Sequence, residues 1–280
     1  IWFMKYVILG PTASGKTAYA IALAKQVNGA VISADSRQIY AGMNIGTAKP
    51  SEAWQETPHA SDVPDNIDGV PHYLLNVTSL DAPYTLTDWL AAAKQCISII
   101  ESQGQTPIIA GGTMLYIDAL VDGYDIPTIE PNQELRAALE QKTPEELYKE
   151  LLEKDPAATA FIEPHNSRRI IRALEVTHAT GKPFSSLRTK KTSDTWTKIG
   201  IFPDWESIKN NISQRSEEML AQGLEQEKES LLEQFPASPL LQTVNYKEKN
   251  IEEMTQSNMR YAHRQMSWWK RDKTIGWICV

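Results

Sequence analysis

The sequence is poor in cysteine and lacks any long apolar run. Only two of its 280 residues are cysteine, in no spacing typical of a metal or redox site, which argues against a disulfide-stabilised scaffold. No stretch approaches the roughly 18 apolar residues of a membrane span, and the first residues do not have the layout of a secretory signal peptide. We therefore expect a globular protein of the cytoplasm with no membrane partner.

Charge is distributed unevenly along the chain. The formal net charge is −7, which by itself argues against a nucleic-acid partner. Residues 165–198, however, carry an excess of six positive charges, and residues 217–253 carry an excess of six negative charges. The positive stretch is compatible with a polyanion bound on one face, and equally with an ordinary solvated helix surface. Charge alone therefore leaves nucleic-acid binding open.

Apolar strand patterns alternate with helical patterns in the first part of the chain. This alternation is typical of a parallel sheet whose strands are joined by crossover helices. Each apolar run is too short for a helix and continuous enough for a strand buried on both faces. The sequence therefore predicts an α/β fold. The strand patterns cover residues 5–10, 30–34 and 106–112, and the helical patterns cover residues 16–27 and 85–104.

The middle of the chain changes to purely helical patterns. A segment punctuated by proline, residues 124–132, marks the change. We predict a parallel-sheet core made of residues 1–124 and 196–280, interrupted by a small helical domain over residues 125–195. The elements predicted in this half are helices over residues 134–142, 144–154, 166–180, 204–222 and 255–271, and a strand over residues 197–202.

A glycine-rich motif follows the first predicted strand and precedes the first predicted helix. It fits the pattern G-x-x-x-x-G-K-[ST], the phosphate-binding loop called the P-loop. Its backbone N–H groups can surround a phosphate, and the positive end of the helix dipole points at the same anion. Lysine adds a positive charge, and the threonine hydroxyl can bind Mg²⁺. The sequence thus predicts a phosphate or diphosphate site formed by Gly10, Pro11, Thr12, Ala13, Ser14, Gly15, Lys16 and Thr17, with Thr17 as the metal ligand.

The acidic residue expected near this loop is Asp35, which follows the second predicted strand. Ligands of open α/β sheets bind at the carboxyl ends of the strands, so Asp35 is placed for proton transfer. The third strand ends instead in residues 110–113, Ala-Gly-Gly-Thr, without the acid that holds Mg²⁺ in many P-loop hydrolases. A simpler interpretation of Asp35, as a turn-forming or helix-capping residue, stays open.

Several segments together resemble the tRNA dimethylallyltransferase family. They occur in that family's order and cover nearly the whole chain. The Cys/His zinc-finger pattern of eukaryotic members does not follow the last predicted helix, which favours a bacterial type. The resemblance implies a P-loop core, an inserted helical domain that holds the anticodon stem-loop, and transfer of a dimethylallyl group from dimethylallyl diphosphate to N6 of adenosine 37. The segments are GPTASGKT (10–17), ISADSRQIY (32–40), MNIGTAKP (43–50), PHYLLNV (71–77), IAGGTMLYI (109–117), RRIIRALEV (168–176) and RQMSWW (264–269).

The resemblance also implies roles for individual residues. Asp35 would be the general base, and Lys16 and Arg215 would neutralise the leaving diphosphate with Mg²⁺. Thr113 would complete the catalytic set. The positions that correspond to tRNA contacts are Asp35, Ser36, Arg37, Gln38, Thr113, Arg136, Arg168, Arg169, Ile170, Ile171 and Arg172.

One segment departs from the family pattern. Residues 242–248 stand where the family has a turn resembling Gly-Tyr-Arg-Gln, but here Asn245 and Lys247 replace the glycine and the arginine. Asparagine tolerates the positive φ that a glycine would adopt. Lysine cannot offer the two forked donors of arginine, so RNA contacts from this segment are in question.

Three other functions remain compatible with the residues. A nucleotide or small-molecule kinase would use the same P-loop, which is also an ATP-binding motif. An adenylate dimethylallyltransferase would use free AMP and would not need the positive stretch. A non-catalytic RNA-binding P-loop protein would not need Asp35, Thr17 and Arg215 together. We expect a monomer in each case.

Overall fold

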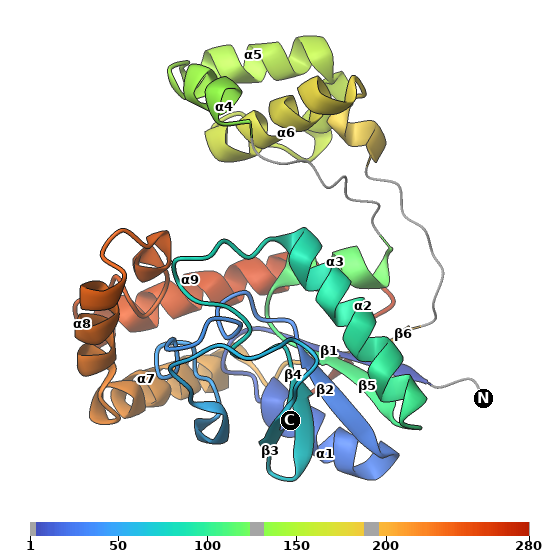
Figure 1. The fold of residues 1–280 in the computed structure, drawn as a ribbon, viewed down its shortest axis with the longest axis vertical. Coiled ribbons are helices and arrows are strands. Elements are labelled where there is room, and N and C mark those ends of the chain that lie inside the picture. Colours follow the sequence, from blue (N-terminus) through green and yellow to red (C-terminus); the bar gives the residue numbers. More distant parts are fainter. Residues whose placement is uncertain (1–3, 124–131, 188–195, 280) are drawn as a thin grey trace. The chain divides into compact units, whose positions relative to one another are not determined.

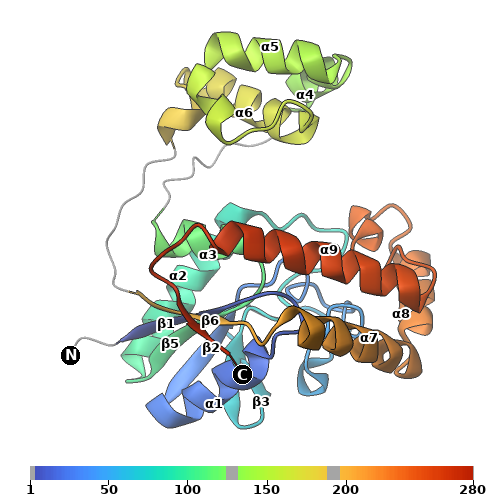
Figure 2. The same cartoon turned by 180° about the vertical axis from the view of Figure 1, so that it is seen from behind.

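The computed structural model describes residues 4–123, 132–187 and 196–279, and the chain forms two compact units. The first unit comprises residues 1–121 and 194–280, and the second comprises residues 122–193. Figures 1 and 2 show each unit from two sides. The linker predicted before residue 132 lies mostly outside the described residues, as do three basic residues of the positive stretch, Arg188, Lys190 and Lys191.

The first unit is built on a seven-stranded sheet with the order β3-β4-β2-β5-β1-β6-β7. All neighbouring strands are parallel except the β3–β4 pair, which is antiparallel. The α/β class predicted from the sequence is therefore confirmed. The strands are β1 (Lys5–Leu9), β2 (Gly29–Ser33), β3 (Asp65–Ile67), β4 (Val70–Tyr73), β5 (Thr106–Ala110), β6 (Trp196–Ile201) and β7 (Gly276–Ile278).

Six α-helices belong to the described part of this unit. Helix α2 begins with a complete capping box between Thr85 and Asp88, which fixes its first turn. Ala20 and Ala24 of α1 pack against the apolar side chains of β1, β2 and β5, so small residues bring this helix close to the sheet. The helices are α1 (Lys16–Val27), α2 (Leu86–Ser102), α3 (Met114–Val121), α7 (Trp205–Ala221), α8 (Leu224–Gln234) and α9 (Ile251–Trp269).

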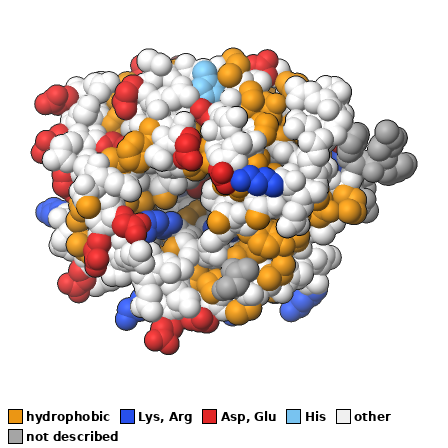
Figure 3. Space-filling view, turned by 90° about the horizontal axis from the view of Figure 1, so that it is seen from below, with side chains coloured by type: hydrophobic (Ala, Val, Ile, Leu, Met, Phe, Trp, Pro, Cys, Tyr) orange, Lys and Arg blue, Asp and Glu red, His pale blue; other side chains and the backbone are white. Residues whose placement is uncertain are grey.

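Helices α7 and α9 lie side by side (Figure 2). Ile208 and Ile212 of α7 pack against Ala262 of α9 in a buried cluster that also contacts Ala13 of the P-loop. The P-loop, α7 and α9 are therefore held together by one buried apolar cluster. On the surface, acidic side chains gather on the side of α7 and α8 (Figure 3), in keeping with the negative excess of residues 217–253.

Several short elements of this unit escaped prediction. The hairpin of β3 and β4 has strands of three and four residues, too short to show an alternating pattern. Helix α8 has few apolar residues, and α9 begins four residues before the predicted start because Asn250 caps it. Two 3₁₀ turns, Ser51–Ala53 and Pro239–Gln242, complete the unit.

The second unit is a small bundle of α4 (Gln133–Glu140), α5 (Pro144–Lys154) and α6 (Ser167–Thr180), with 3₁₀ turns at Pro156–Ala160 and Phe184–Leu187. The side chains of Ile170 and Ile171 are buried in its core, at 0% and 7% exposure. They were expected among the tRNA contacts, but their side chains lie inside the bundle and not on its surface. Among the described residues, no helix combines the length and hydropathy needed to cross a membrane.

Candidate active site

The P-loop connects β1 to α1 as the sequence predicts. Gly15 caps the start of α1 with φ +88°, and Ala13 also adopts a positive φ of +61°. A side chain at Gly10 would collide with the carbonyl of Ile201 in β6, so only glycine lets the two strands approach there. The loop therefore has the tight curvature that points backbone N–H groups at an anion.

Two cations stand at this loop, and neither forms an ion pair with a carboxylate of the described residues. Lys16 donates to the carbonyl of Pro11 at 2.6 Å, and Arg215 of α7 donates to Thr12 Oγ1 at 2.8 Å. Burial and the nearby Arg215 lower the pKa of Lys16 to about 7, which the charge of Asp35 only partly opposes. Burial also lowers the pKa of Arg215 to about 10. An anion bound here would relieve both shifts.

Asp35 lies just after β2, at the carboxyl edge of the sheet. Its Oδ1 accepts from the backbone N–H groups of Arg37 at 2.8 Å and Gln38 at 3.3 Å, so the turn-forming interpretation is correct for this oxygen. Its Oδ2 has no hydrogen-bond partner among the described residues. One carboxylate therefore fixes its own turn and still offers a second oxygen to a substrate.

Thr113 braces the same turn. Its Oγ1 accepts from the backbone N–H of Ser36 at 2.9 Å, and its own N–H donates to the carbonyl of Ala34 at 3.0 Å. A side chain at Gly111 would collide with Ala34, which explains the glycine pair that ends β5. Thr113 thus holds the segment that carries Asp35.

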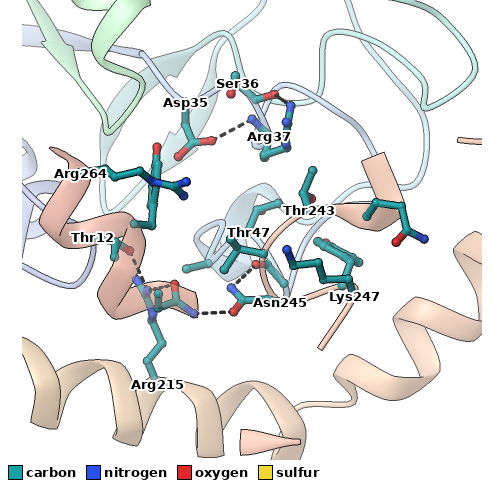
Figure 4. A pocket seen from close by; sticks show the side chains of 17 residues that line it. Thr12, Asp35, Ser36, Arg37, Thr47, Arg215, Thr243, Asn245, Lys247 and Arg264 are labelled. Atoms are coloured by element: carbon teal, nitrogen blue, oxygen red, sulfur yellow. Dashed lines mark hydrogen bonds between the residues drawn. The ribbon is translucent and has the colours of Figure 1, made fainter. Parts of the chain in front are cut away.

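A cavity of about 320 Å³ lies beside these groups (Figure 4). Its wall brings together six parts of the sequence: the P-loop, the turn after β2, residues 46–48, the middle of α7, residues 242–247 and the centre of α9. Among the residues predicted as site residues, Thr12, Asp35, Ser36, Arg37 and Arg215 line it. The wall also includes Gly46, Thr47, Ala48, Gln242, Thr243, Val244, Asn245, Tyr246, Lys247, Asn258, Tyr261 and Arg264.

The remaining predicted residues lie elsewhere. Thr17 is exposed on the first turn of α1 and, with Gln38, borders a second, smaller cavity. Gln38 donates to the carbonyls of Thr47 and Ala48 at 3.1 and 3.2 Å, so it supports the cavity wall from behind. Lys16, Thr113 and the P-loop residues other than Thr12 belong to the first unit but are not part of the cavity lining. The predicted arginines of the helical unit are Arg136, Arg168, Arg169 and Arg172.

Helix α9 supplies two site residues to which no role was assigned from the sequence, Gln265 and Tyr261. Gln265 accepts from the N–H of Thr12 at 2.7 Å and donates to the carbonyl of Gly112 at 2.9 Å, which ties the P-loop to the end of β5. Tyr261 donates to the same carbonyl at 3.0 Å. The helical pattern over residues 255–271 predicted the helix, and the RQMSWW segment of the resemblance includes Gln265, but neither reveals these long-range contacts.

The segment that departs from the family pattern forms part of the cavity wall. Asn245 adopts φ +73°, which confirms that asparagine here takes the left-handed conformation expected of the glycine it replaces. Lys247 lines the cavity beside it. Glu227 of α8 anchors this region, since it accepts from the N–H groups of Ile45 and Gly46 and from the hydroxyl of Tyr246.

In the helical unit, two arginines converge on a buried carboxylate. Arg136 of α4 contacts Glu175 at 2.8 Å, and Arg172 of α6 lies 3.7 Å from the same oxygen. The Glu175 side chain is only 1% exposed. Arg168 and Arg169 are exposed on the first turn of α6. Arg136 and Arg172 thus approach a buried acid, whereas Arg168 and Arg169 belong to the exposed start of α6.

Known proteins resemble this chain over most of its length. The family model described as IPP transferase matches residues 38–272, and the model described as Isopentenyl transferase matches residues 4–58. The tRNA dimethylallyltransferase of Geobacillus kaustophilus is 37% identical over 97% of this chain and 89% of its own length. That of Dehalococcoides mccartyi is 36% identical over 98% of this chain and 87% of its own.

Solved structures agree with these relatives. The tRNA isopentenylpyrophosphate transferase of Bacillus halodurans is similar with a TM-score of 0.68 at 30% identity, covering 99% of this chain and 90% of that one. A eukaryotic dimethylallyltransferase described as acting on tRNA reaches a TM-score of 0.78 at 25% identity, covering 96% of this chain and 70% of that one. The chain therefore belongs to the IPP transferase family, as the resemblance seen in its sequence predicted.

Proposed function

We propose that this protein transfers a dimethylallyl group from dimethylallyl diphosphate to N6 of adenosine 37 in tRNA. One observation carries the proposal: Asp35, with an oxygen that has no hydrogen-bond partner in the described chain, lines the same cavity as Arg215 and Thr12. A base for the acceptor and a cation for the leaving group thus border one cavity, and the family assignment supports the same chemistry.

The donor half of the reaction needs a stabilised leaving group. The allylic carbon–oxygen bond breaks readily once the diphosphate charge is neutralised. Lys16 and Arg215 stand at the P-loop, where they donate to Pro11 and Thr12. These cations are present before the reaction, so little reorganisation is needed as negative charge develops on the diphosphate.

The acceptor half needs a proton to be removed. The N6 amine of adenine is a weak nucleophile because its lone pair is delocalised into the ring. As the new carbon–nitrogen bond forms and the carbon–oxygen bond breaks, the N6 proton goes to Asp35 Oδ2 and diphosphate leaves. Thr113 and the turn N–H groups hold the carboxylate in place during this step.

The protein would supply only part of the ligand shell of a Mg²⁺ ion at the donor site. No group of three or more His, Cys, Asp or Glu side chains suitable for a metal occurs among the residues that the structure describes. Mg²⁺ commonly takes few protein ligands and completes its shell with phosphate oxygens and water. The exposed hydroxyl of Thr17 is the protein ligand we propose, and the metal would neutralise diphosphate charge.

The helical unit is the proposed holder of the anticodon stem-loop. Arg168 and Arg169 face outward at the start of α6, and guanidinium groups suit phosphate contacts. A single-stranded anticodon loop also lets an adenine leave its stack at low cost and reach a recessed cavity. We expect the protein to act as a monomer in the cytoplasm.

One assay separates this proposal from its competitors. The protein is incubated with radiolabelled dimethylallyl diphosphate and Mg²⁺, together with tRNA, with AMP or with no acceptor. Label incorporated into tRNA alone is the expected result. Label on AMP would indicate an adenylate dimethylallyltransferase. No transfer in any mixture, together with ATP hydrolysis that depends on Lys16, would overturn the proposal in favour of a kinase or hydrolase.

A further inference from the structure

A chain of hydrogen bonds runs along the cavity wall from the P-loop to the segment after β2 (Figure 4). Arg215 donates to Asn258 Oδ1 at 3.3 Å, and Asn258 Nδ2 donates to Asn245 Oδ1 at 2.6 Å. Asn245 Nδ2 then donates to the carbonyl of Gly46 at 2.8 Å. Arg215 also donates to Thr12, so the chain begins at the phosphate-binding loop.

The hydrogen bonds of this series can run from donor to acceptor in only one direction. A carbonyl oxygen can only accept, so Gly46 fixes the amide of Asn245 with its nitrogen towards that carbonyl. The oxygen of Asn245 then requires the nitrogen of Asn258, which leaves the oxygen of Asn258 facing Arg215. A guanidinium can only donate, and it therefore satisfies the last acceptor. Both amide orientations are thus determined by groups at the two ends.

The two amides are well removed from water. Asn245 is 6% exposed and Asn258 is 4% exposed. Asn258 has a further anchor, because its Nδ2 also donates to the carbonyl of Met254 at 2.9 Å. A buried neutral acceptor can orient a cation without neutralising it, whereas a carboxylate in the same place would compete with a bound anion. The arrangement therefore positions Arg215 and leaves its charge for a ligand.

We propose that Asn245 is a positioning residue that acts through Asn258 to aim the Arg215 guanidinium at the donor's diphosphate. The proposal rests on the function proposed above for Arg215. The turn at residue 245 has a backbone that glycine would also adopt, but a glycine has no side chain to make these bonds. Asparagine thus keeps the left-handed backbone of the turn and adds a link to the catalytic arginine.

The sharpest variant is Asn245→Gly. Glycine adopts φ +73° without steric cost, so this variant keeps the turn and loses only the two side-chain hydrogen bonds. A matched control is Asn28→Gly, which makes the same exchange at another residue of positive φ, the end of α1. Its side chain makes one long bond to Gly104 and does not line the cavity.

The measurement is the dissociation constant of inorganic diphosphate with Mg²⁺, determined by calorimetry without tRNA. We expect Asn245→Gly to weaken binding about fivefold, the effect of one ordinary hydrogen bond, and Asn258→Ala to weaken it about tenfold. The double variant should match Asn258→Ala alone, because both residues act on Arg215 through one chain. The turnover with dimethylallyl diphosphate should fall as well, since the same diphosphate is the leaving group.

Each outcome decides the proposal. Unchanged diphosphate binding in Asn245→Gly, with or without a shift in melting temperature, would show a purely structural asparagine and overturn it. Effects of the two substitutions that add fully in the double variant would also overturn it. Failure of the unaltered protein to bind diphosphate would instead contradict the proposed function. If Asn245→Gly does not fold, the dissociation constants of diphosphate for Asn258→Ala, for Asn245→Ser and for the variant that combines them complete the same test.

Discussion

The cations at the P-loop and two arginines of the helical unit are held in opposite ways. At the P-loop, Lys16 and Arg215 donate to neutral oxygens of Pro11, Thr12 and Asn258. In the helical unit, Arg136 and Arg172 approach the buried carboxylate of Glu175. A cation held by neutral groups keeps its charge for a ligand, whereas a carboxylate already neutralises part of it.

The lowered pKa of Lys16 shows what it costs to bury a cation that has no anion beside it. Burial without a compensating anion disfavours the charged form of Lys16, and its pKa falls to about 7. A diphosphate would supply the missing negative charge. The P-loop cations thus keep their charge for a small anion, whereas Arg136 and Arg172 already face the carboxylate of Glu175. The predictions below test that difference.

The largest effect is expected for Asp35→Asn. Asparagine keeps an oxygen that can accept from the N–H groups of Arg37 and Gln38, so the turn should persist while the proton acceptor is lost. We expect turnover to fall about 10²-fold or more, with tRNA affinity nearly unchanged, because the lost interaction belongs to the transition state. Steady-state kinetics and a binding titration measure the two quantities. Turnover close to that of the unaltered enzyme would assign the proton to another group.

A second prediction concerns the pH dependence of diphosphate binding. Lys16 loses its proton as pH rises through about 7 in the free protein, and a bound diphosphate raises its pKa again. Binding near pH 8.5 should therefore take up about one proton through this side chain. Calorimetry in two buffers of different ionisation enthalpy gives the proton count. Lys16→Met should show about one proton less, and equal counts would contradict the account.

The same shift has a consequence for stability. The unfolded chain holds the Lys16 proton up to its ordinary pKa near 10.5, whereas the folded protein releases it near 7. The unfolded state thus binds more protons between these values, so this group makes stability rise with pH across that window. In Lys16→Met this contribution should vanish. Denaturant titrations at pH 7 and pH 9 compare the two proteins, and an equal change in both would contradict the pKa shift.

A smaller effect is expected in the helical unit. Arg168→Glu should weaken tRNA binding about fivefold and reduce its log–log salt slope by roughly one unit, the loss of one phosphate contact. Lys149→Glu makes the same charge change at an exposed position of α5 and serves as the control. Diphosphate binding should not change in either variant. Equal effects of the two substitutions on tRNA affinity would reduce the role of Arg168 to general electrostatics.

Local signals made much of the fold predictable. The strands flanked by glycine and the helices begun by Thr85 and Asp204 carry their boundaries in neighbouring residues, and the structure confirms both caps. The P-loop is equally local, because its glycines, lysine and threonine are consecutive. Short strands such as β7, with three residues, leave no periodic pattern and depend on pairing with β6.

The candidate site was predictable only where its chemistry is local. Asp35 could be placed from its position after a strand, but its division into a turn-holding and an accessible oxygen required the structure. Gln265 and Thr12 are 253 residues apart, and no sequence pattern announces their hydrogen bond. In α6, Ile170 and Ile171 lie between arginines in the sequence, and their neighbours placed them among the expected tRNA contacts, yet their side chains pack inward.

The most direct test of the central claim is the identity of the modified nucleoside. An unmodified tRNA with adenosine at position 37 and a matched tRNA with guanosine there are each incubated with dimethylallyl diphosphate and Mg²⁺, digested and analysed by mass spectrometry. We expect N6-(dimethylallyl)adenosine from the first tRNA only, and a strong loss of product with Asp35→Asn. Equal product from both tRNAs, or none from either, would contradict it.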